Sequence, residues 1–345
     1  NDLETGEVVS SAGIMNPQIR FGEDLISRVS FIQQNPGSQT DLIDTVRQAV
    51  DELARETATD VGIDVSSIID MTVVGNPIMH HIFLGLDPQQ LGQAPFPLIV
   101  NEAVIISVSE LGLEAVNKGA QAYLLPCIAG HVGADTAGVV LAEAPHQSSE
   151  MTLLIDVGTN AEIVLGNKDR ILACSSPTGP AFEGAQISCG QRAALGAIER
   201  VRIDSDTLSP KFRIIGSDLW SDDPGFVEAT ADFGVTGICG SGIIEAVAEM
   251  FLAGLVTPAG LIDGKRFPDC PWLMPDGEVY SYRLHEGHTP VVISQTDIRA
   301  IQLAKAALYA GARLLMDTLG VQTPDRIVLA GAFGSHINVQ HAMVL

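Results

Sequence analysis

An aspartate at the start of a predicted turn is the first residue of this sequence that could do chemistry. Asp156 closes an apolar run that predicts a strand, and Gly158, Thr159 and Asn160 predict a tight turn into a second strand. Such a turn can present backbone N–H groups to a phosphate, because glycine lets a ligand approach closely, and Asp156 can hold Mg²⁺ directly or through water. The alternative is an ordinary hairpin whose glycine and asparagine supply positive φ angles.

Two further glycine-rich segments follow the same logic. Gly240, Ser241 and Gly242 precede a predicted helix over 243–255, and a glycine loop at a helix N-terminus is a ready anion site. Their order, G-x-x-G-x-G, is not the Rossmann fingerprint. The third segment follows a predicted buried strand over 327–330, and we interpret it as a backbone ledge for a base and ribose, with a plain tight turn as the alternative. It consists of Gly331, Ala332, Phe333 and Gly334.

Two carboxylates are candidates for positioning a water molecule. Asp135 falls in the first turn of a helix predicted from 133 onward, where the helix dipole favours a negative charge, and simple capping is the alternative role. Glu183 lies in a glycine-rich turn over 178–185 that is expected to lead into a short helix. Neither candidate needs a basic neighbour.

Histidine and cysteine patterns do not indicate a metal site. His80 and His81 are adjacent on a predicted helix over 78–84, so their side chains point about 100° apart. His285 and His288 have ligand-like spacing without a partnering cysteine or carboxylate cluster, so we expect them to be exposed. The five cysteines are an odd number and widely separated, which predicts reduced, buried thiols in a cytoplasmic protein.

Composition sets the class of protein. A chain of 345 residues with 46% hydrophobic residues and 34 glycines is typical of a compact α/β protein of two domains. A net charge of −23 argues against nucleic acids and anionic membrane surfaces as partners. No signal peptide and no apolar run of membrane-spanning length is present in the sequence.

These candidate residues need strands and helices to position them. The pattern predicts an amphipathic helix over 40–57, strands over 68–74, 104–108 and 122–125, and a polar hinge over 143–150. A β-meander is expected over 151–174 and more antiparallel sheet over 199–232, followed by a proline-rich surface excursion over 267–276 and a loop over 284–290. Ser294 and Asp297 form a predicted capping box for a helix to Leu319, and another helix is expected from Asn338.

The order of the three glycine segments resembles the second half of the actin-like ATPase superfamily. LIDVGTN matches its second phosphate motif and LAGAFG matches its adenosine motif. The resemblance implies a two-lobe, ribonuclease-H-like α/β fold, with residues 1–148 as the remainder of the N-terminal lobe and 149–345 as the C-terminal lobe. It further implies ATP and Mg²⁺ as ligands, with Asp156 at the metal.

Longer phrases resemble one family within that superfamily, the reductive activators of corrinoid-dependent methyltransferases. The phrases include NPQIRFGEDLISRV, VVGNPIMHHIFLGLDP, PCIAGHVGADTAGVVLA, SPTGPAFEGAQISCGQRAALGAIE and VTGICGSGIIEAVAEM. The resemblance implies ATP-dependent reduction of inactive Co(II) corrinoid to Co(I), a corrinoid protein of a methyltransferase system as partner, and compatibility with a homodimer. It names no electron donor.

The sequence departs from that family in two ways. The family's first Asp-x-Gly-Thr phosphate turn is expected upstream of residue 1, and the 2Fe-2S cluster is expected in an N-terminal domain outside this chain. We therefore interpret the chain as the ATPase module of a longer activator, a fragment lacking the first strands and the C-terminal end. A small-molecule kinase and a nucleotide-dependent actin-like scaffold are the alternatives.

Overall fold

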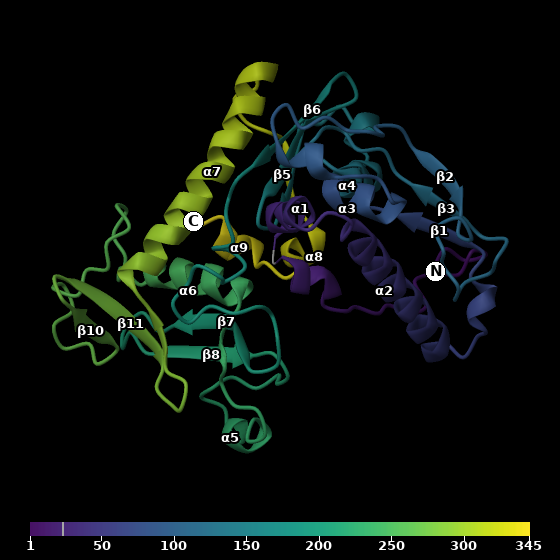
Figure 1. The fold of residues 1–345 in the computed structure, drawn as a ribbon. Coiled ribbons are helices and arrows are strands. Elements are labelled where there is room, and N and C mark those ends of the chain that lie inside the picture. The colour runs from purple at the N-terminus through teal and green to yellow at the C-terminus, as the bar shows by residue number, and fades with distance from the viewer. Residues whose placement is uncertain (23) are drawn as a thin grey trace. The chain divides into compact units, whose positions relative to one another are not determined.

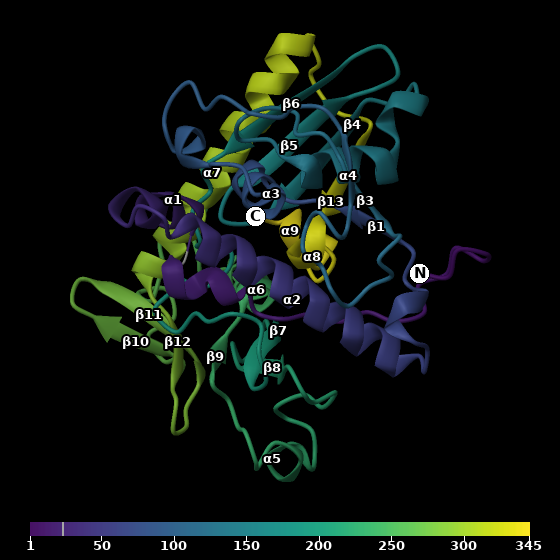
Figure 2. The same cartoon turned by 45° about the vertical axis from the view of Figure 1, so that its right-hand side comes forward.

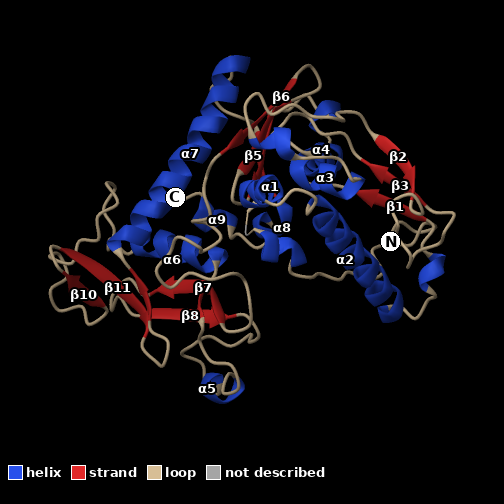
Figure 3. Cartoon of the chain, in the orientation of Figure 1, coloured by secondary structure: helices blue, strands red, loops and turns tan. Residues whose placement is uncertain are grey.

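The computed structural model describes residues 1–22 and 24–345 and divides the chain into two compact units, Asn1–Ala144 and Pro145–Leu345. Figure 1 follows the chain by colour, Figure 2 shows it turned by 45°, and Figure 3 distinguishes helices from strands. The boundary between the units falls inside the polar stretch at 143–150. The two units are called unit 1 and unit 2.

Unit 1 packs helices against a small mixed sheet. The strand order is β1-β3-β2, with β3 parallel to β1 and antiparallel to β2. All strands and long helices predicted here from the sequence are present. In chain order the elements are α1 (Leu25–Gln34), α2 (Gln39–Asp60), β1 (Asp70–Val73), α3 (Pro77–Leu84), β2 (Val104–Ser107), β3 (Gln121–Leu124) and α4 (Ala134–Glu143).

The long helix α2 is amphipathic in the ordinary sense. Leu42 and Ala49 are buried seven residues apart, within about 20° of one another round the helix, and the partly buried Val46 lies beside them. The opposite face is exposed and polar throughout, and it carries Asp41, Asp44, Gln48, Glu52, Arg55 and Glu56. Burial of one stripe therefore accounts for the position of α2.

Unit 2 contains three sheets and the longest helix. Its first sheet has the order β13-β4-β5-β6, in which only β13 is parallel to its neighbour; the others are β8-β7-β9 and β10-β11-β12. In chain order the elements are β4 (Thr152–Val157), β5 (Ala161–Gly166), β6 (Ile171–Ser176), β7 (Ala197–Ile203), β8 (Pro210–Ile214), α5 (Phe226–Ala229), β9 (Gly237–Ile238), α6 (Gly240–Leu252), β10 (Leu273–Asp276), β11 (Val279–His285), β12 (Val291–Ile293), α7 (Gln295–Leu319), β13 (Arg326–Ala330), α8 (Gly331–Gly334) and α9 (Val339–Ala342).

The predicted β-meander and the predicted capping box are both confirmed. β4, β5 and β6 pair antiparallel in register, and α7 packs along β5 and β6 (Figure 1). The Ser294 hydroxyl accepts from Asp297 N–H at 3.2 Å while the Asp297 carboxylate accepts from Ser294 N–H at 2.8 Å, so α7 begins where the sequence indicates. It ends at Gly320, which has a φ of 69°.

Two carboxylates of α6 hold the neighbouring strand β7. Glu245 is fully buried, and it accepts from Val201 N–H at 2.9 Å and from the guanidinium groups of Arg200 and Arg202. Glu249, one turn later, accepts from Ile203 N–H at 2.9 Å. Helix α6 therefore satisfies part of the backbone of β7 that sheet pairing leaves free.

Three expectations about unit 2 are wrong. No helix follows the turn at 178–185, because Gly179 and Gly184 adopt φ angles of 71° and 90° that interrupt a helix. A three-stranded sheet, β10-β11-β12, takes in 273–276 of the expected excursion and 284–285 of the expected loop, whereas 286–290 form a loop as predicted. Strand β13 is not buried as predicted, since it is the edge of its sheet and Ile327 is 55% exposed.

Composition led to expectations about the cysteines and about membrane-spanning segments. All five cysteines are free, but only Cys127 and Cys239 are buried, and the others are partly exposed. Over residues 1–22 and 24–345, no helix combines the length and the apolar character needed to cross a membrane.

Candidate functional site

Asp156 and Gly331 meet at one edge of the first sheet of unit 2. Strands β4 and β13 run parallel, and Asp156 pairs with Ala330 in their register, so both strands end at the same edge. Gly331 follows at once with a φ of 80°, and a Cβ at that position would lie 3.0 Å from Cγ of Asp156 and closer still to Oδ1. The backbone of the third glycine segment therefore lies directly against the half-buried carboxylate of the first.

The turn after Asp156 is held from inside the protein. Gly158 N–H donates to Asn160 C=O at 3.0 Å, and the buried Thr178 hydroxyl donates to Gly158 C=O at 3.0 Å. Neither Gly158 nor Asn160 has a positive φ, so the alternative that these residues were chosen for positive φ angles is wrong. The exposed N–H groups of Thr159 and Asn160 donate to no acceptor within the described residues. Sequence reasoning missed Thr178, although it begins the glycine-rich turn in which Glu183 lies.

Glu183 faces the same turn. Its Oε2 accepts from the Thr159 hydroxyl at 2.8 Å, and its Oε1 would lie 3.7 Å from a Cβ at Gly158. The loop that carries Glu183 is held by Asp297, which is 2% exposed and accepts from Ser188 N–H at 2.8 Å. Asp297 thus caps α7 and also holds the loop of Glu183 beside the turn of Gly158.

The second glycine segment meets the third one and the loop of Glu183 through Gly240. A Cβ there would collide with the carbonyl oxygen of Phe182 and would come within 2.5 Å of Cε2 of Phe333. Phe182 immediately precedes Glu183, and Phe333 lies in the third segment. Only glycine permits this approach, so the first turn of α6 packs against both the Glu183 loop and the Gly331–Gly334 turn.

Ser241 has a different role from the one that its type suggests. It is 6% exposed, and its hydroxyl lies 3.4 Å from Sγ of Cys239, inside the protein. The N–H groups of Gly240, Ser241 and Gly242 stand at the start of α6 and have no acceptor within the described residues. The helix therefore offers backbone N–H groups here, and no side-chain donor.

Asp135 belongs to unit 1, whereas Asp156 belongs to unit 2. It lies in the first turn of α4, and its Oδ1 accepts from Thr136 N–H at 2.8 Å. Burial raises the pKa of this carboxyl above its usual range. Its part in positioning water stays a prediction.

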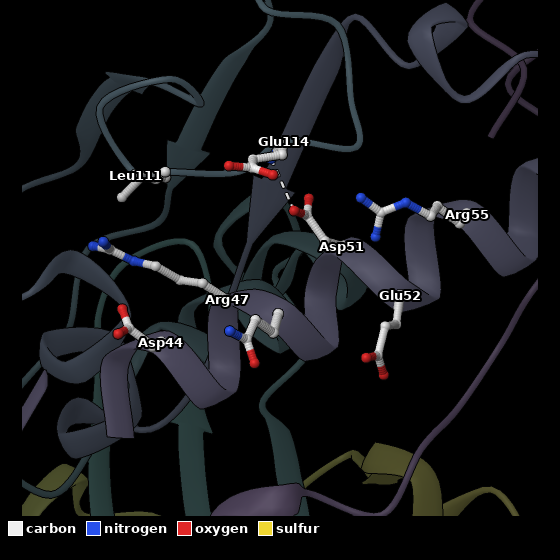
Figure 4. A pocket seen from close by; sticks show the side chains of 9 residues that line it. Asp44, Arg47, Asp51, Glu52, Arg55, Leu111 and Glu114 are labelled. Atoms are coloured by element: carbon white, nitrogen blue, oxygen red, sulfur yellow. Dashed lines mark hydrogen bonds between the residues drawn. The ribbon is translucent and has the colours of Figure 1, made fainter. Parts of the chain in front are cut away.

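A hollow of about 310 Å³ in unit 1 is lined by none of the residues proposed for the nucleotide (Figure 4). Two of its prominent charged side chains are already engaged. Asp51 accepts from Glu114 N–H at 2.8 Å and Ala115 N–H at 3.1 Å, and Arg47 donates to Phe83 C=O at 2.7 Å. These contacts hold the loop before β3 and the end of α3 on α2, so we interpret the hollow as structural.

His81 of α3 has a structural role as well. His81 is fully buried; its Nε2 accepts from Ile99 N–H at 3.1 Å, and its Nδ1 lies 2.7 Å from Pro77 C=O. Nε2 must therefore be unprotonated and Nδ1 must carry the proton. His285 is only partly exposed, because its ring packs on Phe212 at 5.5 Å between centroids. No group of three or more His, Cys, Asp or Glu side chains in the described part of the chain could hold a metal ion.

The neutral state of His81 predicts a pH dependence for unit 1. Burial lowers the pKa of both His80 and His81, so the unfolded chain takes up protons below about pH 6.5 that the folded chain refuses. Stability should be constant above about pH 6.5 and should fall below it by at most about 1.4 kcal/mol per pH unit for each histidine. Hydrogen exchange of peptides covering α3, measured between pH 5 and pH 8, checks this. Exposed His288 replaced by glutamine should leave the slope unchanged, whereas equal protection of α3 at both ends of that range would contradict the expectation.

Replacing Gly331 with alanine should weaken ATP binding by more than the backbone strain at this position explains. The added Cβ meets the Asp156 carboxylate, so we expect affinity for ATP to fall at least about tenfold, in addition to about 1 kcal/mol of strain from the left-handed φ. Gly277→Ala is the matched control, because Gly277 has a φ of 64° and open space around its Cβ direction. Calorimetric titration with ATP and urea unfolding of both variants separate the two effects. Equal ATP affinity in the two variants would show that contact with Asp156 does not matter.

The chain is similar to two protein families that adjoin along its length. Residues 150–345 match the C-terminal domain of RACo, described as the ASKHA domain, and residues 1–148 match the RACo middle region. The ASKHA match covers all three glycine segments and Glu183, whereas Asp135 falls in the middle region.

Individual relatives support the same similarity. The corrinoid activation enzyme RamQ of Eubacterium limosum is 33% identical over 100% of this chain and 57% of its own length. A Co(II) methylated-amine-specific corrinoid protein reductase of Methanosarcina barkeri is 26% identical over 99% of this chain and 61% of its own length. A solved structure, the reductive activator for corrinoid, iron-sulfur protein, matches with a TM-score of 0.81 and 32% identity over 100% of this chain and 54% of that one. The chain thus spans little more than half the length of the proteins it resembles.

Proposed function

The chain belongs to the RACo family of reductive activators of corrinoid enzymes, with an actin-like C-terminal domain, and on that basis we propose that it is the nucleotide-binding part of an activator. The activator returns an inactive Co(II) corrinoid protein of a methyltransferase system to Co(I), in an ATP-dependent reduction. The observation that carries the proposal is the chain of contacts that links Asp156 to the glycine segments of unit 2. Gly331 lies against its carboxylate, and Gly240 lies against Phe333 and the Glu183 loop.

The residues fit a nucleotide with its phosphates at the turn. Five backbone N–H groups have no acceptor within the described residues and are proposed to donate to phosphate oxygens: those of the exposed Thr159 and Asn160, and those of Gly240, Ser241 and Gly242 at the buried start of α6. Gly331, Ala332 and Phe333 form an exposed or half-exposed ledge for the adenosine part. Backbone amides and a helix N-terminus can hold an anion without basic side chains, which suits a chain of net charge −23.

Asp156 also fits Mg²⁺ as a single carboxylate ligand. Magnesium in nucleotide sites keeps several water ligands and takes one or two carboxylates together with phosphate oxygens, so a cluster of three protein ligands is not needed. A bound magnesium ion would neutralise phosphate charge beside the carboxylate. Either Glu183 or Asp135 is proposed to orient water, and Glu183 is held in place by the Thr159 hydroxyl, which donates to it at 2.8 Å.

The role of nucleotide is a coupling role. We propose that the nucleotide state changes how the chain binds its corrinoid partner, through movement of the segments that contain Gly240 and Gly331. A difference of about 1–3 kcal/mol in binding the two cobalt states corresponds to roughly 40–130 mV for one electron. Preferential binding of one state can therefore ease a difficult reduction without contact between the ATP site and cobalt.

The proposal also covers the iron–sulfur cluster, the electron donor and the oligomeric state. The 2Fe-2S cluster is proposed to lie outside this chain. The five cysteines of the chain are far apart in the sequence, and no group of three or more His, Cys, Asp or Glu among the described residues could hold a metal ion. The electron donor stays unnamed. That the activator works as a homodimer is also a proposal, and it requires a surface able to meet its own copy.

The test follows the cobalt absorbance. The gene product that carries this chain is mixed with a candidate corrinoid protein and a low-potential reductant, and conversion of Co(II) to Co(I) is recorded with and without ATP. We expect ATP to increase the rate, and calorimetry on the 345-residue chain to detect ATP binding. ATP binding with phosphoryl transfer to a small molecule would favour a kinase, and nucleotide-dependent polymerisation would favour a scaffold.

A further inference from the structure

Strands β4 and β5 each carry one charged side chain, and the two are paired across the sheet. In β4 the charged residue is Asp156 and in β5 it is Glu162; both are half-buried, and every other residue of β5 is buried. The antiparallel register pairs Asp156 with Glu162. Side chains paired in this way point to the same face, with Cβ atoms about 4.5–5.5 Å apart. The two carboxylates therefore share one face, at the end of the sheet where the turn of Gly158 begins.

The residues on either side of this pair are small and uncharged. Ala330 of β13 pairs with Asp156 and Ser175 of β6 pairs with Glu162, so one row across the four strands reads Ala330, Asp156, Glu162, Ser175. The Ser175 hydroxyl donates to Oε1 of Glu162 at 3.0 Å. A carboxylate has lone pairs for further partners after it accepts one such bond. Ser175 thus orients Glu162 and leaves it able to bind a cation.

The hydrogen bond to Ser175 does not explain why residue 162 is charged. The side-chain oxygen of a glutamine could accept the same bond, whereas two carboxylates directly opposite each other on neighbouring strands repel and destabilise a sheet. A divalent cation beside both of them replaces this repulsion by attraction. Mg²⁺ in nucleotide sites takes one or two carboxylates together with phosphate oxygens and water. We propose that Glu162 is a second carboxylate of the magnesium site at Asp156.

This inference rests on the proposed function, because the phosphates of the nucleotide supply the other ligands of the metal. It makes a prediction that a structural role of Glu162 does not make. With magnesium, Glu162 attracts the metal and strengthens ATP binding. Without magnesium, its negative charge repels the phosphates and weakens ATP binding. Neutralising the side chain should therefore change the two affinities in opposite directions.

Calorimetric titration of the 345-residue chain with ATP, once in excess magnesium chloride and once in excess EDTA, measures both affinities. Glu162→Gln should lower the affinity in magnesium at least about tenfold and raise the affinity in EDTA about threefold. Glu199→Gln is the matched control, since Glu199 is a half-buried glutamate of β7 that pairs with Arg213 at 3.6 Å. It should leave the ratio of the two affinities unchanged. Circular dichroism checks that each variant is folded.

Ser175→Ala is a second variant, which keeps both carboxylates and removes only the hydroxyl that orients Glu162. It should lower the affinity in magnesium about threefold or more and leave the affinity in EDTA unchanged. A Glu162→Gln chain with the wild-type ratio of affinities would overturn this inference while the proposed function stands. Equal losses in magnesium and in EDTA would do the same, because they indicate a structural role. A wild-type chain that binds no ATP in magnesium would overturn both.

Discussion

Replacement of Asp156 by alanine is expected to abolish the ATP dependence of corrinoid reduction while unit 2 stays folded. The carboxylate lies at the end of β4 between the turn of Gly158 and the backbone of Gly331, whose segment also packs against Gly240. Loss of one group that fixes phosphate and metal charge typically costs about 100-fold or more in rate. The measurement is the rate of Co(I) formation with ATP divided by the rate without it.

The matched control for Asp156 is an exposed aspartate on the same sheet. Asp169 lies in the turn between β5 and β6, so Asp169→Ala removes the same charge from unit 2 at a distance from the glycine segments. We expect this variant to keep the full ATP effect. An Asp156→Ala protein that still responds to ATP as the wild type does would remove Asp156 from the site.

Replacement of Glu245 by alanine is expected to lower the free energy of unfolding of unit 2 by about 3 kcal/mol. The carboxylate is fully buried and accepts from Val201 N–H and from two guanidinium groups, so its removal leaves a buried donor without an acceptor. Arg200 and Arg202 are each about one third exposed and can turn to water, which places the loss at the low end of the usual range for broken buried pairs.

Urea unfolding followed by tryptophan fluorescence measures this effect, since both tryptophans lie in unit 2. Glu278→Ala, at an exposed hairpin turn, should change the unfolding free energy by less than about 0.5 kcal/mol. Arg200 also donates to His336 C=O at 2.9 Å, so the Glu245 variant should loosen the segment after Gly334 as well. Equal midpoints for the two variants would mean that Glu245 contributes no more than a surface carboxylate.

The close contacts at the glycine segments were predictable because glycine is required where another chain segment approaches closely. Gly240 and Gly331 stand where a Cβ would collide with a carbonyl oxygen and a carboxylate, and such positions are visible in a sequence as glycine-rich phrases. The side-chain role of Ser241 was less accessible. The helix was expected to begin at Ile243, but it begins at Gly240, which brings Ser241 into the first turn and points its hydroxyl toward Cys239.

Long-range pairing explains what the sequence did not predict about the fold. Pro271, Pro275 and Pro290 indicated loops, yet β10 to β12 form because Tyr282 and Leu284 bury their side chains in the core of unit 2. The hydrogen bond that Ser188 N–H donates to Asp297 joins residues 109 positions apart, and no local sequence pattern can indicate it. The capping role of the same aspartate was predicted, since it depends on neighbours within four positions.

The exposed edge of strand β13 favours aggregation of the chain in concentrated solution. It is the last strand of its sheet, so among the described residues it has a strand neighbour on one side only, and the 55% exposed Ile327 marks that edge. Unpaired backbone N–H and C=O groups along an edge can add a strand from another molecule and begin β-sheet aggregation. Particles formed in this way would grow without a fixed stoichiometry, which distinguishes them from any closed two-chain assembly.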